Sequence, residues 1–365
     1  MSELYGIELL RRLSLAFGPT GCEGDVADII EETISGFADE ISRDRKGNVV
    51  AVLYGKNHGT ADERRFMFSA HMDEVGFMIT DINGDGTLKF TNLGGIVPSV
   101  LPARRVTVKG SCGEYIPAVI GSKPIHLQEG GERGKAEGIS SLYIDIGAKD
   151  KEDAQKYVSR GDFATFSSDF VRFGHEEKQI KCKALDDRFG CAVECDALRT
   201  LSREERGGAD IIFAFTVSEE IGKSGAKTAA YRVNPHVAVV LEATAVADNM
   251  GLPETSRVAE QGKGPAVSFM DKGTVYGRDM YKAVMETADV HGIPAQPKRF
   301  VSGGNDAAHI QRIRGGVHVA AVSAPARYIH TAVDTINADD YESTVSLALA
   351  LARDADRIIG GLSEQ

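Results

Sequence analysis

Several apolar runs of this sequence end in side chains that can bind metals or transfer protons. The run 210–217 leads within two residues to a pair of adjacent acids, Glu219 and Glu220. A second run leads directly to His71 and Asp73. Three more segments end in the same residue types, namely Glu242, His330 and the adjacent acids Asp186 and Asp187. Histidines and carboxylates without a thiolate form a ligand set that suits Zn, Co or Mn.

The elements that must position these side chains alternate between helices and strands. Apolar periodicity predicts a helix near the N-terminus, another after Asp187 and a last one over 339–358. Apolar runs over 209–217 and 236–243 predict strands between them. Such alternation with short links indicates an α/β domain with a mostly parallel sheet. Because open α/β sheets place their chemistry beyond the carboxyl ends of the strands, the acids and histidines are expected to converge.

From about residue 74 to residue 166 the pattern changes to short β-like runs separated by glycine turns. The stretch DINGDG at 81–86 is typical of a hairpin, and only 148–160 has a helical pattern. This composition predicts a small β-barrel or sandwich. We therefore expect an α/β catalytic domain over 1–73 and 170–365, with a mixed, mostly parallel sheet flanked by helices. A small barrel-like β domain over 74–169 would interrupt it.

The number of candidate ligands favours two metal ions over one. One ion needs about four ligands, and the set exceeds that number, so two ions that share a carboxylate account for it economically. Taken singly, Asp186 or Asp187 could cap a helix, Glu219 could begin a turn and His330 could be a packed histidine. Taken together, so many buried carboxylates without a cation would be too costly.

Longer motifs around these residues carry a family resemblance. The stretches LSLAFGPTGCEG, SAHMDEVGFMI, VIGSKPIHL, KALDDRFGCAV, TVSEEIGKSGA and RYIHTAVD occur in this order along nearly the whole chain. They resemble the M42 family of metallo-aminopeptidases. The resemblance implies a hydrolase (EC 3.4.11.-) that removes N-terminal residues from short peptides. It also implies two divalent metal ions per subunit, with Zn or Co expected and Mn also compatible.

The resemblance implies a role for each candidate residue. It implies five metal ligands: His71 and Glu242 for the first ion, Glu220 and His330 for the second, and Asp186 as the bridge. Asp73 would orient His71, as an acid on the far ring nitrogen of a ligand histidine does. Glu219 would be the general base, taking a proton from the attacking water and delivering it to the leaving amine. Two adjacent glutamates can serve both purposes because neighbouring side chains that leave a strand point in different directions.

The motifs also bear on a competing ligand, a peptide bond and one further histidine. Many family members carry aspartate where this chain has Glu242, and Asp248 lies nearby as a competing ligand. The peptide bond between Asp186 and Asp187 is expected to be cis, as in related enzymes. His309, in GGNDAAHIQR, is expected to be a packed or exposed histidine and not a ligand.

The amino-acid composition argues against some classes of partner and indicates the cellular compartment. The 42 Lys and Arg against 53 Asp and Glu give a net charge of −11, which argues against nucleic acid or anionic membrane. The five cysteines include no CxxC pair, so we expect free thiols in a reducing cytoplasm. We see no signal peptide and no membrane span. By resemblance, the inserted domain would mediate dimerisation, and dimers could build a twelve-subunit homo-oligomer.

Two other functions compete with peptide hydrolysis. Some relatives carry an endoglucanase label, but a glycoside hydrolase usually needs aromatic sugar platforms, and this chain has no tryptophan. A non-catalytic scaffold would require a lost base or ligand, and none is missing. The preferred N-terminal residue, whether acidic, neutral or basic, is left open.

Overall fold

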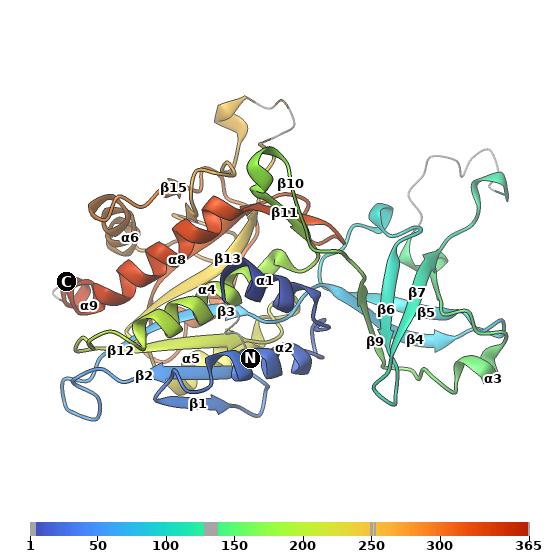
Figure 1. The fold of residues 1–365 in the computed structure, drawn as a ribbon, viewed down its shortest axis with the longest axis horizontal. Coiled ribbons are helices and arrows are strands. Elements are labelled where there is room, and N and C mark those ends of the chain that lie inside the picture. The colour runs from blue at the N-terminus through green and yellow to red at the C-terminus, as the bar shows by residue number, and fades with distance from the viewer. Residues whose placement is uncertain (1–4, 128–137, 249–250, 252, 364–365) are drawn as a thin grey trace.

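The computed structural model describes residues 5–127, 138–248, 251 and 253–363. Figure 1 shows two parts side by side, a large α/β part that contains both chain ends and a β-barrel joined to it by extended segments. Each part has a hydrophobic core of its own. None of the helices described has the length and apolar character that a membrane span requires.

An eight-stranded sheet forms the centre of the α/β part. Its strands lie in this order: β1 (Glu40–Arg43), β2 (Val49–Leu53), β12 (Asp210–Thr216), β3 (Arg65–His71), β13 (Val237–Ala245), β16 (His318–Ala326), β14 (Ala266–Val267) and β15 (Gln296–Pro297). The central strands β12, β3, β13 and β16 are parallel to one another, whereas β1–β2, β2–β12 and β14–β16 pair antiparallel. The prediction of a mixed, mostly parallel sheet is confirmed.

Helices cover both faces of this sheet because the strands are apolar on both sides, as buried parallel strands are. Phe213 and Phe215 belong to the cluster on one face, and Ile212 and Ala214 to the cluster on the other. The first face is covered by α1 (Gly6–Leu15), α2 (Gly24–Ile34), α4 (Leu185–Leu201), α6 (Arg278–Val290), α8 (Ala338–Arg353) and α9 (Ala355–Ser363). The second is covered by α5 (Ser224–Val233) and α7 (Ala307–Ile310).

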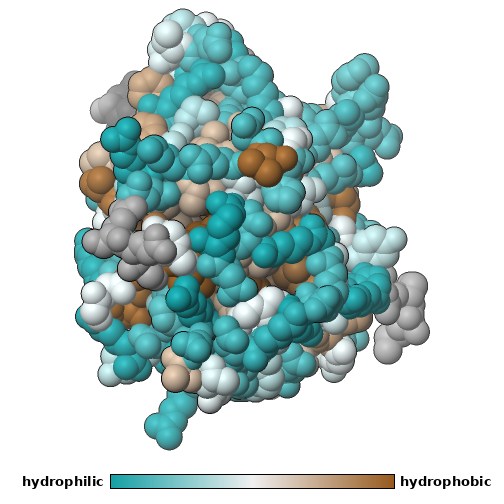
Figure 2. Space-filling model, turned by 90° about the vertical axis from the view of Figure 1, so that its left-hand side faces the viewer, coloured by the Kyte–Doolittle hydropathy of each residue, from teal (hydrophilic) through white to brown (hydrophobic). Residues whose placement is uncertain are grey.

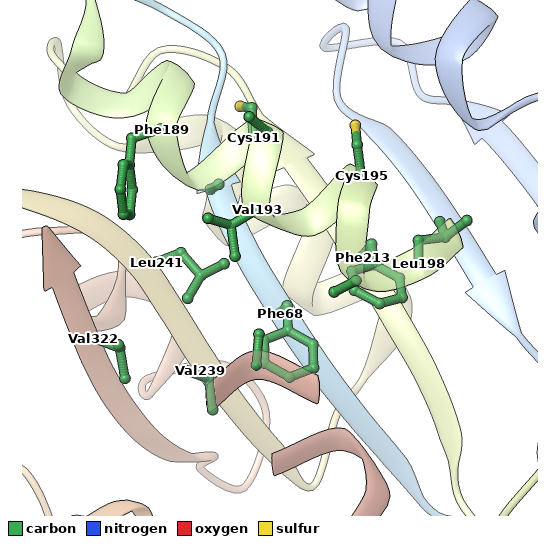
Figure 3. Close-up of a cluster of buried hydrophobic side chains, with 14 of the residues drawn as sticks. Phe68, Phe189, Cys191, Val193, Cys195, Leu198, Phe213, Val239, Leu241 and Val322 are labelled. Carbon is green, nitrogen blue, oxygen red and sulfur yellow. The ribbon is translucent and has the colours of Figure 1, made fainter. Parts of the chain in front are cut away.

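Helix α4 is the central helix of the first face. Figure 3 shows Phe189 and Val193 of α4 lying over Leu241 and Phe68 of the sheet. The thiol of Cys191 donates to the main-chain oxygen of His71 at 3.2 Å. This packing fixes the start of α4 against the carboxyl end of β3.

The second part is a closed antiparallel barrel of six strands. They lie in the order β4 (Gly76–Ile82), β5 (Leu88–Leu93), β8 (Tyr143–Asp145), β7 (Tyr115–Gly121), β6 (Arg105–Lys109) and β9 (Phe163–Phe166), with β9 pairing back to β4. Phe77 packs edge-on against both Phe90 and Phe166 at its centre, with 5.2 Å between ring centroids in each pair. The predicted barrel-like insertion is therefore present, while the exact domain boundaries at 73/74 and 169/170 stay a prediction.

A small antiparallel sheet lies where the chain returns from the barrel. It contains β10 (Val171–Phe173), β11 (Gln179–Cys182) and β17 (Asp334–Asn337), in that order. Strand β11 leads into α4, and β17 follows the loop that holds His330. The small sheet thus brings the start of α4 close to the loop that holds His330.

Two predicted helices differ from those observed. The helix expected over 148–160 is only α3 (Lys151–Ala154), because the chain turns after Ala154 and Gly161, at φ +92°, leads it into β9. The helix expected over 339–358 is divided into α8 and α9. Asp354, at φ −88° and ψ 5°, departs from helical geometry and ends α8.

Candidate active site

The predicted site residues lie at one edge of the large sheet. His71 is the last residue of β3 and pairs in register with Thr216, the last residue of β12. The chain then turns at Ser218, which has a φ of +58°, and presents Glu219 and Glu220. This turn places the two glutamates beside the end of β3.

Three more side chains reach this edge from distant parts of the sequence. Glu242 lies in β13, Asp186 in the first turn of α4, and His330 in the loop between β16 and β17. Asp186 and Glu242 are each only 7% exposed. The convergence expected from parallel topology is thus seen in the structure.

These side chains form two groups that share one carboxylate. In the first group, Nε2 of His71 lies 3.3 Å from Oδ1 of Asp186 and 3.3 Å from Oε1 of Glu242. In the second, Nε2 of His330 lies 3.4 Å from Oδ2 of Asp186 and 3.4 Å from Oε1 of Glu220. Asp186 therefore offers one oxygen to each group.

The donor set fits divalent metal ions. Oδ1 of Asp186 and Oε1 of Glu220 are buried without a hydrogen-bond partner, although buried carboxylate oxygens are normally hydrogen-bonded. Each group offers nitrogen and oxygen donors that point to a common centre, as ligands of a cation do. Three protein donors per group leave room for water or substrate, which is typical of catalytic and not of structural zinc sites.

Burial dominates the electrostatics of the site. It raises the pKa of Glu242 to about 8 and the pKa of Glu220 well above its ordinary value, and the positive charges of His71 and His330 only partly oppose this. Burial also acts to raise the pKa of Asp186, but the adjacent rings of His330 and His71 outweigh this effect and lower that pKa. Carboxylates so deeply buried need nearby positive charge to stay ionised at neutral pH.

Both histidines are held through their far ring nitrogens. Nδ1 of His330 donates to the main-chain oxygen of Gly95 at 2.8 Å. Nδ1 of His71 lies 3.1 Å from the main-chain oxygen of Asp73 and 3.5 Å from its carboxylate Oδ1. The expected contact of the Asp73 carboxylate is present, but the main-chain carbonyl of the same residue is closer. In each case Nε2 is left available to bind a cation.

The carboxylate of Asp73 also holds the two adjacent glutamates. Its Oδ1 accepts the main-chain N–H of Glu219 at 2.9 Å, and its Oδ2 accepts that of Glu220 at 3.1 Å. The hydroxyl of Thr20 donates to Oδ2 at 2.7 Å. Asp73 thereby couples the β3 exit to the β12 exit, a role that sequence reasoning did not foresee.

Glu219 lies outside both groups. Its Oε1 accepts a hydrogen bond from the ammonium of Lys223, four residues further on, while Oε2 has no hydrogen-bond partner among the described residues. Burial raises the pKa of Glu219, and the positive charges of His71 and Lys223 oppose it. Glu219 therefore presents one oxygen that is free to exchange a proton.

A cavity of about 300 Å³ opens over both groups. Besides the candidate ligands and Glu219, its walls include two lysines, Lys223 and Lys298. They also include several small residues, namely Ala243, Thr244, Ala245, Ser302, Gly303, Gly304, Asn305 and Ser323. This volume is at the lower end of the range for small-molecule sites, roughly 300–1,000 Å³. The cavity suits the end of a peptide better than the middle of a long chain.

The structure also shows where Asp248 and Asp187 lie, the two acids that the motifs leave as neighbours of candidate ligands. Asp248 forms an ion pair with Arg327 at 2.6 Å and belongs to neither group, whereas Glu242 belongs to the first. The peptide bond between Asp186 and Asp187 is cis. The carboxylate of Asp187 points away from both groups, accepting the N–H of Gly190 at 3.0 Å and that of His71 at 3.3 Å.

Sequence reasoning missed several residues that support the site. Lys223 reaches the cavity from the residue before α5, and Lys298 from the segment after β15. Lys223 could have been found from its spacing, because it follows Glu219 by four residues. Nothing local distinguishes Thr20 or Lys298 from other loop residues. His309 lies on α7, half-buried and outside both groups.

Comparisons with known proteins agree with this geometry. A family model described as M42 glutamyl aminopeptidase matches residues 47–347. A relative from Pyrococcus furiosus, described as a lysyl aminopeptidase, is 31% identical over 348 residues, covering 94% of this chain and 96% of the relative.

Solved structures resemble the whole chain. A TET aminopeptidase from the archaeon Thaumarchaeota archaeon SCGC AB-539-E09 superposes with a TM-score of 0.91 at 32% identity, covering 97% of this chain and 98% of the other. The TET1 peptidase of Pyrococcus horikoshii superposes with a TM-score of 0.84 at 34% identity, covering 95% and 98%. That peptidase is described as assembling into a tetrahedron or a large octahedral shell.

Proposed function

The chain belongs to the M42 glutamyl aminopeptidase family and is an aminopeptidase, and on that premise we propose that it cleaves short peptides with two metal ions and Glu219 as general base. The observation that carries the proposal is the sharing of Asp186 between the two groups, one oxygen to each. His71 and Glu242 would hold the first ion, Glu220 and His330 the second, and Asp186 both. Zn or Co is the expected metal, with Mn also compatible.

In the proposed reaction, the protein's own residues would transfer the proton and hold the reacting groups in position. Two divalent ions in these positions would lower the pKa of a water and polarise the peptide carbonyl. Glu219 would accept the proton of the attacking water at Oε2, while Lys223 holds Oε1 in place. As the C–O bond forms and the C–N bond breaks, Glu219 would return that proton to the departing amine. Asp73 keeps the main chain of Glu219 in position throughout.

Replacing the general base tests this proposal. We expect Glu219→Gln to reduce kcat by about 10²- to 10⁴-fold, the range for a lost general base, on aminoacyl-p-nitroanilides. Bound metal, measured by inductively coupled plasma mass spectrometry, should stay at two ions per subunit, because Glu219 is not a ligand. Glu286→Gln, on the exposed side of α6, is the matched control and should leave kcat unchanged.

Chelation and an alternative substrate complete the test. Exhaustive dialysis against a chelator should abolish activity, and Zn, Co or Mn should restore it. Carboxymethylcellulose should not be hydrolysed, which separates the peptidase from a glycoside hydrolase. Full activity of the Glu219→Gln variant, or of the chelated enzyme, would refute the mechanism.

Assembly and compartment extend the proposal beyond the site. We propose that the barrel carries a dimer contact and that dimers build a larger homo-oligomer, since the P. horikoshii relative is described as a tetrahedral or octahedral shell. The acidic net charge and free cysteines support a cytoplasmic protein with no nucleic-acid or membrane partner.

A further inference from the structure

Lys298 is a buried ammonium in the wall of the active-site cavity. It follows β15 directly, is only 5% exposed and lines the same cavity as His71 and Glu242. An ammonium group has three hydrogens to donate. Among the described residues Nζ of Lys298 has one hydrogen-bond partner, the main-chain oxygen of Ser302 at 2.9 Å. The remaining donor capacity is therefore available to something in the cavity.

The neighbouring carboxylates do not supply the missing partner. Oδ1 of Asp271 accepts main-chain N–H groups from Gly273 and Thr274 at 2.7 and 2.8 Å, and its Oδ2 accepts the hydroxyl of Tyr276. Among the described residues, no carboxylate hydrogen-bonds to Lys298. Burial lowers the pKa of Lys298, although the charges of Asp271 and Glu242 oppose that shift. A buried ammonium in this position would gain from a carboxylate ligand.

The second lysine of the cavity wall is in a different position. Nζ of Lys223 donates to the carboxylate of Glu219 and to its main-chain oxygen at 3.3 Å, so it already has an anionic partner. Of these two lysines, Lys298 is therefore the one whose ammonium has no anionic hydrogen-bond partner among the described residues.

The wall beside Lys298 leaves space for a short side chain. Gly303 and Gly304 line the cavity there, and a Cβ built on either would meet no heavy atom closer than 3.6 Å. The metal-binding groups form another part of the same wall. A substrate whose scissile carbonyl sits over those groups would therefore direct its N-terminal side chain into the remaining space.

We propose that Lys298 selects peptides whose N-terminal residue carries a side-chain carboxylate, aspartate or glutamate. The inference rests on the proposed function, because it needs the N-terminal residue to occupy this cavity. Family membership does not decide the matter, since the family description names glutamyl cleavage while the P. furiosus relative is described as a lysyl aminopeptidase. The preference must come from this chain's own residues.

Three substrates separate the sources of a carboxylate. Glutamyl-p-nitroanilide carries one only on the N-terminal side chain, the dipeptide Ala-Ala only at its C-terminus, and alanyl-p-nitroanilide carries none. In Lys298→Met we expect kcat/KM for the glutamyl substrate to fall about 10- to 100-fold, the effect of losing one charged hydrogen bond. The fall should lie mainly in KM, and both alanyl substrates should stay within roughly threefold of wild type.

Further variants sharpen the result. Lys298→Arg should recover part of the glutamyl activity, because it retains the charge. Lys298→Glu should favour lysyl-p-nitroanilide over the glutamyl substrate. Lys272→Met, an exposed lysine of a neighbouring loop outside the cavity wall, is the matched control and should resemble wild type.

Three outcomes would overturn the inference. An equal fall on all three substrates, with reduced thermal stability, would mean that Lys298 only tethers the loop at Ser302. A fall on Ala-Ala alone would assign Lys298 to the C-terminal carboxylate of dipeptides. Unchanged kinetics in Lys298→Met would leave it no role in selection. If wild type hydrolysed no aminoacyl substrate at all, the proposed function itself would fail, which is a distinguishable result.

Discussion

At the scale of single residues, the site depends on carboxylates whose burial is compensated by specific neighbours. Asp186 is compensated by His71 and His330, and Asp73 by the N–H groups of Glu219 and Glu220. One buried carboxylate has no such compensation. Glu194 lies on α4, fully buried, and neither of its oxygens has a hydrogen-bond partner within the described part of the chain. Burial raises the pKa of Glu194 well above its ordinary value.

We expect Glu194→Met to stabilise the fold, and increasingly so as pH rises. A carboxyl with a raised folded-state pKa favours folding below its unfolded pKa, and that contribution is lost as pH rises through the folded pKa. Methionine removes the unpaired polar group, worth about 1–3 kcal/mol, and has no such pH dependence. Urea unfolding of both proteins at a series of pH values between about 5 and 9 measures the difference.

The exposed residue Glu286 of α6 provides the control, since Glu286→Met should change stability little at any pH. A stability gain from Glu194→Met that stayed constant with pH would contradict the prediction, because it would mean that the folded-state pKa of Glu194 is not raised.

At the scale of elements, a buried charge cluster joins the segments that carry the candidate ligands. Oε1 of Glu74 accepts from Lys183 at 2.6 Å, and its Oε2 accepts from Thr165 of the barrel strand β9 at 2.7 Å. Arg188 of α4, fully buried, approaches the same Oε1 at 3.5 Å and donates to the main-chain oxygen of Met72 at 2.6 Å. The cluster therefore ties the β3 exit to α4 and to the barrel.

Glu74→Ala should destabilise the protein by about 3–5 kcal/mol, because it leaves Lys183 and Arg188 buried without their carboxylate. The midpoint of urea unfolding measures this loss. Thr165→Val removes only one hydrogen bond and should cost about 1 kcal/mol. Equal losses in the two variants would mean that the charges of the cluster are compensated by other groups.

At the scale of the whole molecule, the barrel and the α/β part present different surfaces. Figure 2 shows that the end of the α/β part opposite the barrel is predominantly hydrophilic, with hydrophobic residues scattered among hydrophilic ones. The barrel has a shallow hollow of about 530 Å³ whose wall includes Pro117, Val119 and Ile146. Val119, on β7, is 46% exposed. This hollow is our candidate for the proposed dimer contact.

Val119→Arg should weaken that assembly, because a long charged side chain would fill part of the hollow and bring a charge into the contact. Size-exclusion chromatography with light scattering should report a smaller mass than wild type, with the thermal stability of the subunit unchanged. Val290→Arg serves as the control, because Val290 lies at the end of α6 and its side chain is 79% exposed. A wild-type mass for Val119→Arg would exclude this hollow from the contact.

The sequence by itself determined the fold class and predicted which residues meet at the candidate site. Apolar runs predict parallel strands, and parallel strands bring their carboxyl ends to one edge, so residues as far apart as His71 and His330 could be expected to meet. This reasoning works because the location of a strand end is a local property of the chain. It cannot show which atom of a residue makes a contact, as the main-chain oxygen of Asp73 demonstrates.

Only the tertiary structure decided the contacts between distant segments that carry no local pattern. Lys298 has no feature in its own segment that marks it as a cavity residue. Only the structure shows that Asp248 pairs with Arg327, whereas Glu242 lies in the first candidate group. The Glu74 cluster spans residues 91 and 109 positions apart in the chain. Such contacts depend on the summed packing of many elements, and a short window of sequence does not contain that information.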